Sequence, residues 1–171
     1  LFLIFGFNFG VNRESRFQTQ YPNNTNNFPE NLKFIDINGK EYSLSDFKNK
    51  KVMLWLFATW CPACVSGLKV LSDENTQLKQ YNFVIIALKT YNNAGFPGPD
   101  LKELVNKNAP NLLKENNWVF GEATKELTSF YNKNNYPDIY YLIDEQGRIK
   151  EVNSAPAATL DTIIKFLKSQ Q

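Results

Sequence analysis

The chain has 171 residues, which is enough for one domain of ordinary size. Its 19 Lys and Arg residues nearly balance 17 Asp and Glu residues, and a net charge of +2 indicates neither a nucleic-acid-binding protein nor a polybasic membrane-binding one. Two cysteines and no histidine exclude His-dependent triads, HExxH metalloproteases, His-ligated haem and a four-ligand Cys/His zinc site within one chain. The remaining chemistry belongs to carboxylates, lysines, hydroxyl groups or the two cysteines.

The N-terminal segment, residues 1–11 (LFLIFGFNFGV), is strongly apolar but too short to cross a bilayer, which takes about 20 residues. We interpret it as the remnant of a signal peptide or membrane anchor. The alternative is a short apolar segment that packs on the domain or on a partner. An anchor places the protein outside the cytoplasm, in the periplasm or at the cell surface, where dithiols and disulfides both persist. Residues 12–30 are polar and aperiodic and indicate a tether. One domain is predicted over 31–171.

A hairpin is predicted at the start of this domain. Apolar residues alternate over 32–44 around Asn38-Gly39, a dipeptide typical of a two-residue type I′ turn. Residues 45–47 then begin a short helical piece.

Two apolar runs, 52–58 and 82–88, are typical of strands buried on both faces, because a strand wet on one face would alternate. Residues 62–80 between them show a helical period and begin with Pro62, which suits the first position of a helix. Strand, helix and strand predict a β-α-β crossover.

The second half of the chain continues this alternation of elements. We expect a Gly/Pro-rich loop at 92–99, a helix at 100–106, a turn at 111–115, a short strand at 118–120, a helix at 123–131, a hairpin of 139–143 with 148–152, and a last helix at 157–168. These elements predict an α/β fold, a mixed sheet with helices on both faces.

The two cysteines lie in the motif Trp60-Cys61-Pro62-Ala63-Cys64, where a predicted buried strand ends and a helix begins. The unpaired N–H groups of a helix N-terminus stabilise a thiolate, so Cys61 is the predicted exposed nucleophile. Cys64 lies one turn further along and should be more shielded. Such a pair can close and reopen a disulfide: Cys61 attacks a substrate disulfide and Cys64 resolves the mixed disulfide. No cofactor beyond this redox-active disulfide is expected, and no metal.

Three other interpretations of the cysteine pair stay open. The pair can form a purely structural disulfide, although a loop this short removes little entropy from the unfolded chain. Two thiolates can hold Cu(I) in a two-coordinate site. The cysteines can also be two ordinary core residues.

Residues 52–64 (VMLWLFATWCPAC) resemble the active-site segment of the thioredoxin superfamily. Residues 34–52 (FIDINGKEYSLSDFKNKKV) resemble its extracytoplasmic TlpA/ResA-like (DsbE-like) branch, and residues 136–149 (YPDIYYLIDEQGRI) resemble the cis-proline strand and hairpin of that branch. The similarity covers about residues 31–169. It implies a thioredoxin-like fold, a central mixed β-sheet with helices on both faces and an extra N-terminal β-hairpin.

The same resemblance implies a substrate-binding edge. It predicts a cis peptide bond before Pro137, in a loop that faces the two cysteines and exposes the Tyr136 backbone for pairing with a substrate strand. Trp60 would flank the thiols as an exposed aromatic contact, and Pro62 and Ala63 between the cysteines complete the predicted contact residues. The alternatives are an ordinary trans proline before a strand and a plain core Trp.

The chain departs from its relatives at the proton acceptor. Thioredoxins carry a buried Asp where this chain has Trp55, and some ResA-type cytochrome-maturation reductases carry Glu and Pro where this chain has Gly67 and Lys69. Water or a residue of the 92–100 loop remains open as acceptor, and cytochrome c maturation is a weaker expectation. Gly67 costs a helix about 1 kcal/mol relative to Ala. It can mark a close approach of backbone or substrate, or it can have no such role.

The sequence therefore predicts a monomeric, exported or membrane-anchored thiol:disulfide oxidoreductase. Its expected partners are protein thiols or disulfides and a redox partner protein such as a membrane electron donor, with no nucleic acid. A copper-binding thioredoxin-like metallochaperone and a thiol peroxidase are the alternatives. The direction of electron flow does not follow from the sequence.

Overall fold

Seven strands form one mixed sheet in the computed structural model, which describes residues 32–169. The elements in chain order are β1 (Lys33–Asp36), β2 (Glu41–Ser43), the 3₁₀ helix η2 (Leu44–Phe47), β3 (Lys51–Phe57), α1 (Pro62–Asp73), α2 (Asn75–Leu78), β4 (Phe83–Lys89), the 3₁₀ helix η3 (Tyr91–Gly95), α3 (Leu101–Asn108), the 3₁₀ helix η4 (Pro110–Lys114), β5 (Trp118–Ala123), α4 (Lys125–Tyr131), β6 (Asp138–Ile143), β7 (Ile149–Asn153) and α5 (Leu160–Lys168). The strand order is β2-β1-β5-β4-β3-β6-β7. The predicted α/β fold with its N-terminal hairpin is confirmed.

The predicted anchor remnant (1–11) and tether (12–30) lie outside the described residues, so both stay predictions. Within residues 32–169, no helix has the length and apolar character needed to cross a membrane.

The centre of the sheet is the pair β3 and β4, which run parallel. Every residue of β3 is buried, as are all but the last of β4, which confirms the two predicted buried strands. β3 also pairs antiparallel with β6. The connection between β3 and β4 was predicted as one helix, but it consists of α1 and α2, which meet at Glu74.

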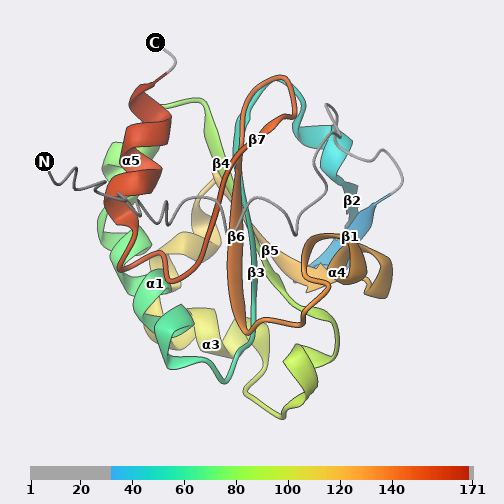
Figure 1. Cartoon of the computed structure of the whole chain (residues 1–171). Helices are drawn as coiled ribbons and strands as arrows, with labels where there is room; N and C mark the ends of the chain where they lie inside the picture. The colour runs from blue at the N-terminus through green and yellow to red at the C-terminus, as the bar shows by residue number, and fades with distance from the viewer. Residues whose placement is uncertain (1–31, 170–171) are drawn as a thin grey trace, which may run out of the picture.

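Alternate residues of β3 point into two separate cores. Met53, Trp55 and Phe57 pack on the face covered by α1, α3 and α5, which lie together on one side of the sheet in Figure 1. Leu54 and Leu56 pack on the opposite face, against residues of η2 and α4. The cysteines belong to the first core, so the Cys-x-x-Cys motif lies on the α1 side of the sheet.

The N-terminal hairpin is present, but its turn is not the predicted type I′. That turn needs a positive φ at both central residues, and only Gly39 has one (φ 83°). A side-chain cap explains the difference: Asp36 Oδ1 accepts hydrogen bonds from the N–H groups of Asn38 and Lys40, both at 2.8 Å. The carboxylate thus stabilises a longer loop, as Asx residues do in turns.

The C-terminal half follows the predicted order. β5 is longer than the three residues predicted, because it pairs on both sides, parallel with β4 and antiparallel with β1. β6 and β7 form the expected antiparallel hairpin. α5 packs its apolar face on the α1 side of the sheet.

Candidate functional site

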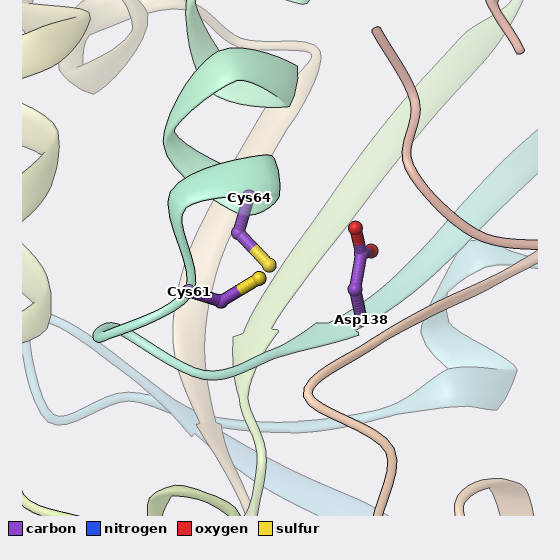
Figure 2. A group of neighbouring side chains, drawn as sticks. All are labelled: Cys61, Cys64 and Asp138. Atoms are coloured by element: carbon purple, nitrogen blue, oxygen red, sulfur yellow. The ribbon is translucent and has the colours of Figure 1, made fainter. Parts of the chain in front are cut away.

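The two cysteines lie at the start of α1, directly after the central strand β3. Three residues separate the end of β3 from Cys61, which is the N-cap of α1 with extended backbone (φ −81°, ψ 116°). Cys64 lies in the first turn of α1, three residues after the N-cap Cys61. The two sulfurs therefore lie close together (Figure 2). Both cysteines are free thiols. The structure therefore brings the predicted redox pair together.

Burial of the pair is greater than predicted. Cys64 is completely buried, as expected, but Cys61 is only 6% exposed, although the sequence predicted an exposed nucleophile. The reason is that Cys61 lies in the core between the sheet and α1 rather than on a free helix tip. Pro62 and Ala63, between the two buried thiols, are exposed.

The Cys64 thiol is held in its protonated form. Its Sγ donates a hydrogen bond to the carbonyl oxygen of Pro137 at 3.3 Å. Burial raises the pKa of Cys64 well above its usual range, and the negative charge of Asp138 and the neighbouring Cys61 raise it further. Because its pKa is raised, Cys64 requires a proton acceptor in order to react as a thiolate.

Asp138 is the nearby carboxylate, and the sequence analysis missed it. One carboxylate oxygen and the two sulfurs lie within 4.8 Å of one another, and Figure 2 shows the side chain of Asp138, the first residue of β6, beside the two sulfurs. Trp55 Nε1 donates to Asp138 Oδ1 at 2.8 Å, and the N–H of Ala155 donates to Oδ2 at 3.0 Å. The available signal was an Asp directly after Pro137 at the start of a strand.

Opposing effects determine the protonation of Asp138. Burial raises the pKa of its carboxyl group above the usual value. The hydrogen bonds from Trp55 and Ala155 work in the other direction, because they stabilise the carboxylate, and the neighbouring Cys64 thiol acts in the same sense. The net direction is upward, so Asp138 holds a proton more readily than an exposed aspartate.

Trp55 explains the glycine in α1. A Cβ built on Gly67 would lie 3.0 Å from Trp55 Cη2 and 3.3 Å from Pro156 Cδ. Trp55 is fully buried, so its ring has little room to move. The predicted close approach at Gly67 is thus made by an indole ring rather than by backbone or substrate.

Gly67→Ala is expected to lose about 1 kcal/mol of unfolding free energy, although Ala is the better helix former. Overpacking costs about 1–3 kcal/mol, and the helix propensity returns about 1 kcal/mol. Urea denaturation measures the change. In a Trp55→Phe background the smaller ring leaves room, and the same substitution should then be stabilising. A stabilised Gly67→Ala protein with Trp55 in place would contradict this packing account.

The loop before β6 differs from the prediction. The described residues contain no cis peptide bond, so the bond before Pro137 is trans where the sequence predicted cis. The Asn132 side chain binds the backbone beside this bond: it accepts from the Tyr136 N–H and donates to the Tyr136 carbonyl oxygen, both at 2.8 Å. Both backbone groups predicted to pair with substrate are therefore occupied. The Tyr136 side chain remains 42% exposed.

The 92–100 loop supports the segment before Cys61. Asn93 Oδ1 accepts from the Thr59 N–H, and the Asn93 carbonyl oxygen accepts from Trp60 Nε1, both at 2.8 Å. Gly98 packs so closely that a Cβ there would lie 2.5 Å from Thr59 Oγ1. The 92–100 loop is thus packed against the segment that carries the cysteines.

Trp60 is partly buried and stands beside the exposed Phe96, with ring centroids 5.4 Å apart. It is therefore neither a plain core residue nor fully exposed. The predicted aromatic contact surface gains a second member, Phe96, which is 63% exposed and which the sequence analysis did not name.

Comparisons with known proteins agree with this architecture. The Redoxin family model matches residues 22–164. A curated protein of Haemophilus influenzae, described as uncharacterized, is 29% identical over 67% of this chain, and the match spans only 56% of that protein's length. The thiol-disulfide oxidoreductase ResA of Geobacillus kaustophilus is 23% identical over 78% of this chain and 71% of its own length.

Among solved structures, a thioredoxin-like protein from Aeropyrum pernix superposes with a TM-score of 0.61 at 20% identity, over 78% of this chain and 88% of the other. This likeness establishes the fold. With the family match over most of the chain and a Cys-x-x-Cys pair at the start of α1, the chain belongs to the Redoxin family, has the thioredoxin-like fold and is a distant homologue of ResA.

Proposed function

We propose that the protein is a thiol:disulfide oxidoreductase that works through Cys61 and Cys64. The observation that carries this proposal is two free thiols at the N-terminus of α1, with sulfurs that lie together and a carboxylate beside them. In a redoxin with a ResA-type relative, this arrangement supports dithiol chemistry better than a structural role. A structural disulfide would only join residues that the first turn of α1 already holds together.

In the proposed cycle Cys61 is the nucleophile. It is the N-cap, where helix N–H groups without intrahelical partners favour negative charge. Its thiolate attacks a substrate disulfide, and one substrate thiolate leaves. Cys64 then attacks the Cys61 sulfur, which closes the Cys61–Cys64 disulfide and releases the second substrate thiol. The protein loses two electrons and the substrate disulfide gains them; the same steps in reverse oxidise a dithiol.

The proposed substrates are proteins with thiols or disulfides. Trp60, Phe96 and Tyr136 offer partly or fully exposed aromatic rings around the motif, and Pro62 and Ala63 are exposed between the thiols. Aromatic surface of this kind suits apolar peptide segments. Because Asn132 occupies the Tyr136 backbone, we expect side-chain contacts rather than strand pairing to hold the substrate in this arrangement.

The proposal includes a place outside the cytoplasm, since a thiol:disulfide exchange protein with an apolar N-terminal segment suits an oxidising compartment. An N-terminal membrane anchor, a monomeric state and a redox partner protein that resets the Cys61–Cys64 pair belong to the same proposal.

A direct test combines the reduced protein with a model protein disulfide. We expect the substrate disulfide to be reduced and mass spectrometry to show that the protein has lost two hydrogens. The reduction potential of the Cys61–Cys64 pair then determines the direction of exchange in vivo.

Cu(I) titration tests the copper alternative: tight binding without disulfide exchange would favour a metallochaperone. The structure favours exchange, because both Asp138 oxygens accept hydrogen bonds and a third soft ligand is absent among the described residues. Rapid Cys61-dependent peroxide consumption without exchange would favour a peroxidase.

A further inference from the structure

We propose that Asp138 is the proton acceptor of Cys64, a role that rests on the proposed exchange function. Trp55 stands at the position where thioredoxins carry a buried Asp that accepts this proton. No carboxylate follows Cys64 along α1 within the next two turns of the helix. Asp138 brings a carboxylate to the same thiol from another strand, β6. Its carboxylate lies within 4.8 Å of both sulfurs, and in the proposed step it takes the proton directly from Cys64 Sγ.

The sheet register places Asp138 at this point. β6 runs antiparallel to β3, with Asp138 opposite Phe57 and Tyr140 opposite Trp55. Trp55 is thus the diagonal neighbour of Asp138, and its indole N–H reaches Oδ1 at 2.8 Å. The Ala155 N–H binds the other oxygen. Two donors from different parts of the chain therefore hold the carboxylate in one orientation, with the Asp138 side chain beside the two sulfurs (Figure 2).

Cys64 needs such an acceptor because it has no exposed surface from which water could remove its proton. The Pro137 carbonyl oxygen accepts its hydrogen bond but is no base. The ionisable groups facing this point are Cys61 from α1, Asp138 from β6 and the Tyr140 hydroxyl from β6, which is bound to Thr159. Glu151 on β7 acts on Tyr140 rather than on Cys64. Asp138 is the one carboxylate within 4.8 Å of both sulfurs among residues 32–169.

The proposed step balances within the site. In the mixed disulfide Cys61 is neutral, which removes its contribution to the raised pKa of Cys64. The Cys64 proton moves to the Asp138 carboxylate while Cys64 Sγ attacks Cys61 Sγ. The Cys61–Cys64 bond forms, the bond from Cys61 to the substrate sulfur breaks, and the substrate leaves as a thiolate. The Asp138 carboxyl group then gives its proton to that thiolate or to water.

The opposite hypothesis is that Asp138 only anchors Trp55 and Ala155. The two roles predict opposite changes in the rate at which Cys64 resolves the mixed disulfide when the negative charge is removed. Removing the negative charge should make the Cys64 thiol more acidic, because that charge raises its pKa. If the thiolate fraction alone mattered, resolution would become faster. If Asp138 accepts the proton, resolution becomes slower although the thiol is more acidic.

The test uses the aromatic disulfide 5,5′-dithiobis(2-nitrobenzoate) with the reduced protein in stopped flow. Attack by Cys61 releases one coloured thiolate, and resolution by Cys64 releases the second. We expect Asp138→Asn to slow the second phase about a hundredfold at neutral pH and to leave the first little changed. Thiolate absorbance should show the Cys64 pKa lowered. In the wild type the rate of the second phase should increase with pH as Asp138 ionises. This step in the pH dependence should be absent from Asp138→Asn.

Glu151→Gln is the matched control, the same acid-to-amide change on the neighbouring strand, and should leave the second phase unchanged. Asp138→Glu should restore part of the rate. If Asp138→Asn does not fold, Trp55→Phe is the alternative test. It removes a hydrogen bond that lowers the pKa of Asp138, so the step in the pH dependence of the second-phase rate should move to higher pH. A second phase as fast in Asp138→Asn as in the wild type, or an unmoved step in Trp55→Phe, overturns the inference. Absence of a second phase in the wild type instead refutes the proposed function.

Discussion

Replacing Cys61 by serine should abolish disulfide exchange, and this is the largest functional effect expected in the protein. Among the described residues the only other thiol is Cys64, which is completely buried, carries a raised pKa and donates its hydrogen to the Pro137 carbonyl oxygen. It cannot replace Cys61 as the nucleophile, because the thiolate is the attacking species. Insulin reduction and aromatic-disulfide cleavage both measure the loss.

Replacing Cys64 by serine should give the opposite phenotype. Cys61 still attacks, but nothing resolves the product, so a mixed disulfide with substrate should accumulate and be visible on non-reducing gels. The Cys61→Ser protein is the matched control, since it should trap nothing. Full activity of Cys61→Ser, or trapping by the Cys61 variant instead of the Cys64 variant, would reverse the assigned roles.

Gly121→Ala should produce a large loss of stability. A Cβ on Gly121 would overlap the carbonyl oxygen of Ile35 and lie 3.0 Å from the Cα of Asp36. These are backbone atoms of β1, which pairs with β5 at this point, and they cannot turn aside as a side chain can. The β1–β2 hairpin must shift away from the sheet, and we expect a loss of about 3 kcal/mol.

Urea or thermal denaturation measures the Gly121→Ala effect, and hydrogen exchange shows whether protection is lost first in β1 and β2. Gly39→Ala is the control. It has a positive φ of 83° but no atom within 4 Å of the added Cβ, so only backbone strain of about 1 kcal/mol applies. Equal losses in the two variants would show that close packing between β1 and β5 is not the cause.

Local patterns predicted most elements. The unbroken apolar runs at 52–58 and 82–88 indicated buried central strands, because residues in such strands meet core on both faces. The junction of strand and helix at Cys61 followed from the same run and from Pro62 at the first helical position. The turn at Asn38-Gly39 was assigned the wrong type, since the Asp36 cap was not recognised.

The components of the site that were missed lie in segments distant from the two cysteines in sequence. Asn132 binds the Tyr136 backbone next to a trans bond where a cis bond is predicted, and Asn93 of the 92–100 loop accepts a hydrogen bond from the Thr59 backbone N–H. Single asparagines carry no periodic signal, so no sequence pattern distinguishes these two from the many others in the chain.

The redox pair follows from the amino-acid sequence alone. Two cysteines at this spacing, at the end of a buried strand in a chain without histidine, leave dithiol exchange as the best-supported chemistry. The tertiary structure decided the environment of the pair. It buried Cys61, placed Trp55 against Gly67, and brought Asp138 to Cys64. The physical reason is that the spacing and the strand–helix position of the cysteines depend on neighbours along the chain. The environment of the pair depends on the register of β6 against β3 and on how α1 packs across both strands.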